Sequence, residues 1–180
     1  MKYGNATLGQ IEAVWNKLGG DEGVLKFLRD ETEVVTKNRD FINCDEISFI
    51  PDGWSVLPES EQLSNRVRGL YKLDITKVKL HLYEEQKEGR IKGSELRKKL
   101  KEELVLPVNV LDFLLKKENQ HLIPEEWKGK YVFFWGTIYR DSDGDLYVRY
   151  LYWHGDGWSW SCNWLGSDWV GRSPSAVSAS

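Results

Sequence analysis

Tryptophan is concentrated near the C-terminal end of this chain, and this feature constrains the fold more than any other. Seven of the nine tryptophans lie between Trp127 and Trp169. Within residues 158–164, large apolar side chains alternate with small polar ones, which is the pattern of a β-strand with one buried face. A sheet that carries so many large aromatic side chains must bury most of them against a second layer.

Two turns divide the same region into three strands. Residues 131–139 and 146–153 are rich in β-forming side chains. The Asp- and Gly-rich residues 141–145 between them are typical of a tight hairpin. A second turn at residues 154–157 leads into the alternating strand. The sequence therefore predicts a three-stranded antiparallel meander with one buried face.

The preceding residues alternate between helical and extended patterns. Thr7 and Gln10 have the spacing of a capping box, and the helical periodicity after them stops at Gly19. Residues 59–72 are polar and weakly periodic, which indicates an excursion over the surface. Three further helices are expected to begin at residues with N-cap side chains, namely Asp21, Ser94 and Asn109. Short strands are predicted at residues 34–36 and 41–43. Residues 77–82 alternate as in a strand, and a helix that runs on to Gly89 is the alternative.

These patterns predict an α+β protein in which a helical and mixed N-terminal part packs on a C-terminal antiparallel β meander. The expected parts are residues 1–125, the tryptophan-rich module at 126–172 and a loose tail at 173–180. A free meander of about forty residues is marginal in water. We therefore expect helices at residues 95–104 and 110–115 to cover its apolar face.

The overall charge disfavours a protein with a generally basic surface. The net charge is −3 and the isoelectric point is near 5.7, whereas nucleic-acid binding relies on cations that release counterions from phosphates. The basic run around Lys98, Lys99 and Lys101 is flanked by glutamates, as on a solvated helix face. Binding of nucleic acid through these lysines stays an alternative, and it predicts a steep dependence on salt.

The chain start and the scattered metal-ligating residues favour a cytoplasmic protein without a cofactor. Residues 1–20 hold no continuous apolar run, so we expect neither a signal peptide nor a membrane anchor. Cys44 and Cys162 lie far apart without zinc-binding spacing. Nucleophile and nucleotide motifs such as G-x-S-x-G are absent from the sequence. An enzyme alternative remains, a hydrolase or transferase that uses His154 with Asp156 and Asp168, if these side chains converge.

Several segments resemble one family of uncharacterised small bacterial proteins with a tryptophan-rich C-terminal β module. The segments are Ile123–Lys130 (IPEEWKGK), Phe133–Arg140 (FFWGTIYR), Gly9–Val14 (GQIEAV) and Asn109–Asp112 (NVLD), followed by the tryptophan-rich end. The resemblance covers most of the chain. It implies no activity, and therefore no functional residue can be transferred from it.

The leading hypothesis is a non-enzymatic binding module that presents an aromatic-rich β surface to a protein, peptide or carbohydrate ligand. The candidate ligand-binding residues combine aromatic rings with charged neighbours, and they are Tyr147, Arg149, Trp153, Asp168, Trp169 and Arg172. An alternative is a binding protein diversified by a retroelement, similar to proteins of the C-type-lectin fold. Its motivation is that small residues such as Ser159, Ser161 and Asn163 interrupt the aromatic frame.

Overall fold

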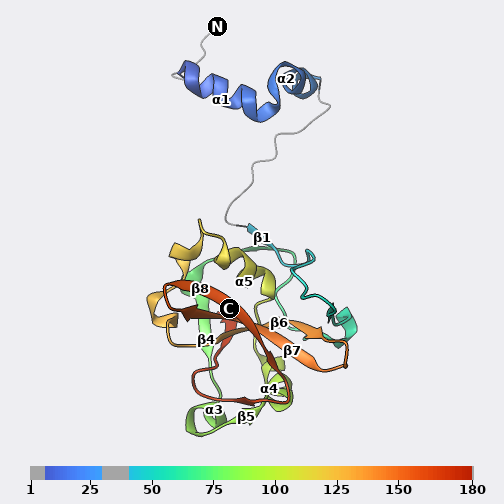
Figure 1. The fold of residues 1–180 in the computed structure, drawn as a ribbon, viewed down its shortest axis with the longest axis vertical. Helices are drawn as coiled ribbons and strands as arrows, with labels where there is room; N and C mark the ends of the chain where they lie inside the picture. The colour runs from blue at the N-terminus through green and yellow to red at the C-terminus, as the bar shows by residue number, and fades with distance from the viewer. Residues whose placement is uncertain (1–6, 30–40, 180) are drawn as a thin grey trace. The chain divides into compact units, whose positions relative to one another are not determined.

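The computed structural model describes residues 7–29 and 41–179 and has the predicted α+β class (Figure 1). The chain divides into two compact units, residues 1–39 and 40–180. The first unit contains α1 (Leu8–Leu18) and α2 (Gly20–Leu28). The helices of the second unit are α3 (Glu84–Glu88), α4 (Gly93–Lys99) and α5 (Val108–Leu115), with 3₁₀ turns η1 (Glu59–Glu61), η2 (Ile75–Lys77), η3 (Leu100–Glu102), η4 (Gln120–Leu122) and η5 (Glu125–Trp127). Its strands are β1 (Phe41–Asn43), β2 (Ser55–Val56), β3 (Leu70–Lys72), β4 (Val78–His81), β5 (Ile91–Lys92), β6 (Val132–Arg140), β7 (Leu146–His154), β8 (Gly157–Trp164), β9 (Asp168–Trp169) and β10 (Ser175–Ser178).

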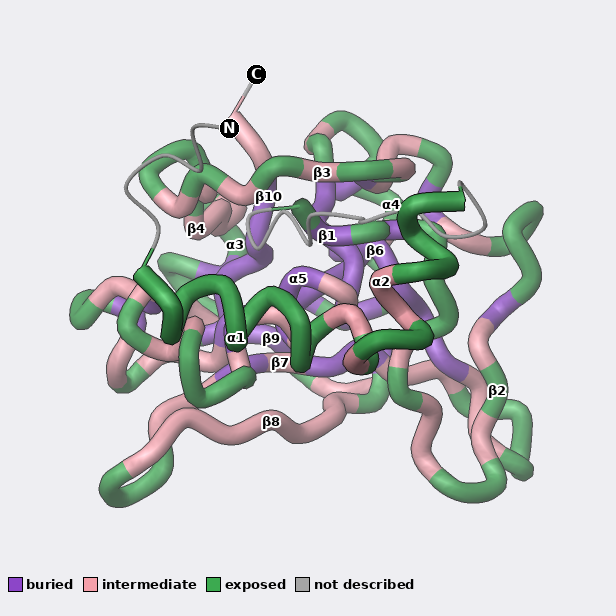
Figure 2. Tube along the Cα trace, turned by 90° about the horizontal axis from the view of Figure 1, so that it is seen from above, coloured by how far each residue is buried: buried purple, intermediate pink, exposed green. Residues whose placement is uncertain are grey.

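The first unit is a helical hairpin whose start follows the predicted capping box. The Gln10 amide donates to the Thr7 hydroxyl at 3.3 Å, and the Thr7 amide donates to the Gln10 side chain at 2.9 Å. Gly19 ends α1 with a φ of 91°, a conformation that favours glycine. No residue of α1 or α2 is buried within this unit (Figure 2). The strand predicted at residues 34–36 lies outside the described residues.

The second unit is built on a sheet with the strand order β4-β10-β6-β7-β8. Strands β6, β7 and β8 are antiparallel, which confirms the predicted meander. The Asp141 carboxylate closes the β6–β7 turn by accepting the amide protons of Asp143 and Asp145 at 3.0 and 2.9 Å. β10 adds to β6 in parallel, and β2 pairs with the far end of β6. No helix among the described residues is long and apolar enough to cross a bilayer.

Strand β6 is buried on both faces because its side chains point alternately into two apolar clusters. Phe134 contributes to the cluster beneath α5, and Trp135 to the cluster beneath α4. The two helices therefore cover opposite faces of the sheet (Figure 1). Gly136 lets the chain at Leu106 and Pro107 approach β6, since a Cβ there would lie 2.7 Å from the Pro107 nitrogen. Both expected helices pack on the meander, but on opposite faces, so the expectation of a single buried face is wrong for β6.

The C-terminal tail is not loose, and this corrects the sequence-based expectation for residues 173–180. Its strand β10 lies between β4 and β6, and Ala176 and Val177 are buried. The amide of Leu106 donates to the Ala176 carbonyl at 3.1 Å. β2 and β4 also come from the expected N-terminal part and lie in the same sheet. The expected boundary between residues 125 and 126 is therefore not a domain boundary.

The isolated fragment Lys128–Ser180 is expected not to fold. It retains β6 but loses α4 and α5, so both faces of that strand would be exposed to water. We expect a collapsed amide-proton spectrum that disperses when the fragment Met1–Trp127 is added. A dispersed spectrum with cooperative melting of the fragment alone would contradict this prediction.

Candidate functional site

Two of the six candidate ligand-binding residues are buried, so the expectation that they form a surface is wrong. Trp169 has 0% exposure. The pairing of β9 with β5 holds it beneath α4, where its ring lies 4.0 Å from Phe133 and 4.8 Å from Trp135, measured between ring centroids. This ring stabilises the core and offers no face to a ligand.

Arg149 is also buried, with 1% exposure. Its guanidinium donates to both carboxylate oxygens of Asp112 on α5, at 2.8 and 3.3 Å. The Trp160 ring lies 4.2 Å from the guanidinium carbon, and the Phe49 ring covers it at 5.4 Å. Arg149 therefore joins the sheet to α5 instead of reaching a ligand.

Each of the other four candidates contacts a different neighbour in its own chain. Asp168 is typical of them: Lys92 and Arg90 lie 2.8 and 3.2 Å from its carboxylate. The hydrogen bond from Lys92 is the main reason why the pKa of Asp168 is lowered. The remaining contacts are those of Tyr147 with Trp54 at 4.4 Å, Trp153 with Lys128 at 4.0 Å and Arg172 with Tyr131 at 5.0 Å.

The side chains of the enzyme hypothesis are not joined. His154 and Asp156 are exposed at the β7–β8 turn, whereas Asp168 lies on β9 in the pairs with Lys92 and Arg90. Within the described ranges 7–29 and 41–179, no hydrogen bond or ion pair connects His154 to either aspartate. The geometry therefore lends no support to a catalytic role for these three side chains.

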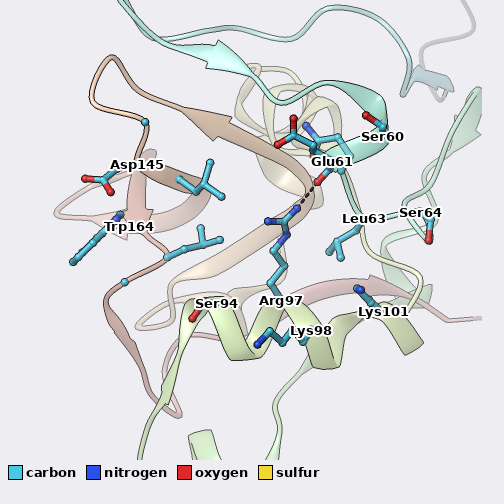
Figure 3. A pocket seen from close by; sticks show the side chains of 15 residues that line it. Ser60, Glu61, Leu63, Ser64, Ser94, Arg97, Lys98, Lys101, Asp145 and Trp164 are labelled. Atoms are coloured by element: carbon cyan, nitrogen blue, oxygen red, sulfur yellow. Dashed lines mark hydrogen bonds between the residues drawn. The ribbon is translucent and has the colours of Figure 1, made fainter.

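A large groove lies elsewhere, between α4, η1 and the neighbouring ends of β7 and β8 (Figure 3). Its volume is about 800 Å³, within the range of small-molecule sites. We call it the α4 groove. The lining side chains that matter below are Ser94, Arg97, Lys98, Lys101, Asp145 and Trp164.

One side of the α4 groove is a helical face that carries positive charge. The residues recur at positions i, i+3, i+4 and i+7 along α4 and η3, and they are Ser94, Arg97, Lys98 and Lys101. The opposite side of the same segment holds Leu96 and Leu100, which are fully buried. The core contacts of these leucines therefore turn the cationic face toward the groove.

The cations of this face lie in no close ion pair within residues 7–29 and 41–179, although the Glu61 carboxylate acts on Arg97. Among the residues that the structure describes, Arg97, Lys98 and Lys101 form no ion pair with a carboxylate. Their neighbour Lys99 points away and pairs with Glu85 at 2.5 Å. The three cations therefore present positive charge to the groove, and the carboxylates of Glu61 and Asp145, which also line it, reduce that field.

Arg97 is the most enclosed of the three. Burial is the main cause that lowers its pKa below the ordinary arginine value. The guanidinium donates a hydrogen bond to the backbone carbonyl of Glu61. The Glu61 carboxylate lies 2.7 Å from the guanidinium of Arg140, and its charge also acts on Arg97, where it opposes the lowering of the pKa by burial. A partly desolvated cation of this kind gains most from an anionic partner.

The other end of the α4 groove holds an exposed aromatic ring. Trp164 is 44% exposed, whereas Trp158 and Trp160 on the same strand pack against the core. A Cβ on Gly166 would collide with the Trp164 ring, so the missing side chain at this position leaves room for the indole. Asp145 lines the groove at the same end (Figure 3).

Sequence reasoning assigned Trp164 to a buried apolar face and the lysines to a solvated helix face. The signal for the groove was present in the helical spacing from Ser94 to Lys101. Comparisons with protein-family models, curated proteins and solved structures found no match for this chain. The resemblance to a bacterial family stays a prediction, and the functional argument rests on the geometry.

Proposed function

We propose that this protein is a binding module that holds an anionic ligand in the α4 groove. The observation that carries the proposal is that one groove combines the exposed ring of Trp164 with three cations that form no ion pair within the part of the chain that the structure describes. An aromatic ring beside charged side chains is the surface expected of the leading sequence hypothesis. It is formed here by residues other than the six candidates.

The groove is suited to binding an anion because its positive side is rigidly held. Leu96 and Leu100 fix α4 and η3 against the core, so little backbone entropy is lost when the cationic face engages a ligand. Ser94 adds a hydroxyl donor beside the cations. Charge-assisted hydrogen bonds to phosphate or carboxylate are stronger than neutral ones.

The test uses inorganic tripolyphosphate as a plain anion and measures binding by isothermal titration calorimetry. We expect the double variant Lys98→Ala/Lys101→Ala to weaken binding about tenfold or more, since each charged hydrogen bond contributes about 1.5–3 kcal/mol. Lys99→Ala is the matched control because Lys99 pairs with Glu85, and it should alter affinity less than about twofold. Equal affinity of the wild type and the double variant would overturn the proposal.

A further inference from the structure

We infer that the ligand of the α4 groove is a nucleotide unit, with its phosphates on the cationic face and its base on Trp164. This inference rests on the function proposed above. The nucleotide unit can belong to a single-stranded nucleic acid or to a free nucleoside triphosphate. The cationic end and the aromatic end of the groove each support it independently.

The cationic end fits a row of phosphates better than a single anion. Arg97 and Lys101 are four residues apart along α4 and η3, which separates them by about 6–8 Å along the axis. Lys98 lies between them in sequence and lines the same groove. A row of basic side chains can contact successive phosphates of a polyphosphate or nucleic acid chain. The planar guanidinium of an arginine can donate two hydrogen bonds to phosphate oxygens.

The aromatic end fits a neutral, planar ring that carries a hydrogen-bond donor. Trp164 is exposed and can stack on any base. The Asp145 carboxylate lines the groove at this end, and carboxylates accept hydrogen bonds from the exocyclic amino group of cytosine. Asp145 therefore predicts a preference for bases with an amino group over uracil or thymine.

The same carboxylate argues against the competing polyanions. A sulfated polysaccharide or an acidic peptide carries negative charge along its whole length, so its groups beside Trp164 would be repelled by Asp145. In a nucleotide the negative charge is confined to the phosphates and the base is neutral. The phosphates can therefore lie beside Lys98 and Lys101 while the base lies beside Asp145. A duplex buries its bases in the stack and cannot present one to Trp164.

The experiment compares CTP with UTP, whose bases differ in the group at position 4 and in the proton on N3. We expect the wild type to bind CTP about tenfold more tightly than UTP, and Asp145→Asn to remove this difference. Trp164→Ala should weaken CTP binding about tenfold while leaving tripolyphosphate affinity within about twofold. Trp153→Ala is the matched control, because its ring lies beside Lys128 outside the groove. Trp164 is exposed, so its replacement should leave the fold intact.

The affinity for a twelve-nucleotide oligocytidine RNA, measured by fluorescence anisotropy, distinguishes a single-stranded nucleic acid ligand from a free nucleoside triphosphate. A single strand as the ligand should bind at least tenfold more tightly than CTP, and three contacting cations predict a loss of about 20-fold between 50 and 200 mM salt. Equal affinity for CTP and the RNA would indicate the free nucleotide.

The inference would be overturned if CTP bound no more tightly than tripolyphosphate, or if Trp164→Ala did not weaken CTP binding. Either result would leave the proposed function standing. Tighter binding of a heparin oligosaccharide or of poly-glutamate than of CTP would overturn it as well. Absence of binding to tripolyphosphate and to every nucleotide would overturn both.

Discussion

Deletion of Ser173–Ser180 is expected to abolish folding of the second unit. The deletion removes the buried side chain of Val177 and leaves the amides of Leu106 and Phe133 without their carbonyl partners. The lost burial contributes about 1.5–3 kcal/mol, and each unpaired buried amide costs about 1–3 kcal/mol. This sum is comparable to the total stability of a domain, about 5–15 kcal/mol. Urea unfolding followed by tryptophan fluorescence would measure the change.

Point variants separate the loss of β10 from a general effect of shortening the chain. Ala176→Asp places a carboxylate at a position with 0% exposure, and it should be destabilising by a similar mechanism. Lys79→Ala changes an exposed residue on β4 that faces Val177 in the register, and it should leave the unfolding midpoint nearly unchanged. A truncated chain with wild-type stability would show that β10 does not stabilise the sheet.

Asp112→Ala is expected to reduce the free energy of unfolding by about 3–5 kcal/mol, because it leaves a buried charge without its partner. Arg149 is 1% exposed and has Asp112 as its ion-pair partner. The Trp160 and Phe49 rings that enclose the guanidinium cannot replace a carboxylate. Chemical denaturation of the variant and the wild type under the same conditions gives the difference.

The double variant Asp112→Leu/Arg149→Met serves as the control for this effect. Replacing both charges by apolar side chains of similar size removes the uncompensated cation, so most of the lost stability should return. Asp143→Ala, in the exposed β6–β7 turn, should change stability by less than about 0.5 kcal/mol. If Asp112→Ala is as stable as Asp143→Ala, the buried pair does not hold α5 on the sheet.

Local sequence patterns were sufficient for the elements whose stabilising contacts are near in the chain. The Thr7–Gln10 capping box and the hairpin closed by Asp141 both involve partners within a few residues, and both were predicted. The meander of β6, β7 and β8 followed from runs of β-forming residues between turns. Asp21, Ser94 and Asn109 were wrongly predicted as N-caps, since the observed N-cap positions are Gly19, Lys92 and Pro107. Asn109 instead donates to the carbonyls of Asn43 and Glu46, which are distant in sequence.

The position of the tail depended on contacts that no local pattern contains. Residues 173–180 have small side chains, four of them serine, and small side chains are compatible both with a loose end and with a strand enclosed by neighbours. The tail forms a strand because β4 and β6 provide backbone hydrogen-bond partners on both sides of β10. The burial of Ser175 between them is likewise a result of tertiary packing.

In the candidate site, too, some features follow from local sequence patterns and others depend on tertiary contacts. The helical spacing of the cations and the alternation in the strand that ends in Trp164 are local patterns that can be read along the chain. The burial of Arg149 and Trp169 and the exposure of Trp164 beside Asp145 depend on contacts between distant segments. Burial of an aromatic or charged side chain depends on which surface packs over it, and here that surface comes from α4 and α5, which precede the β module in the chain.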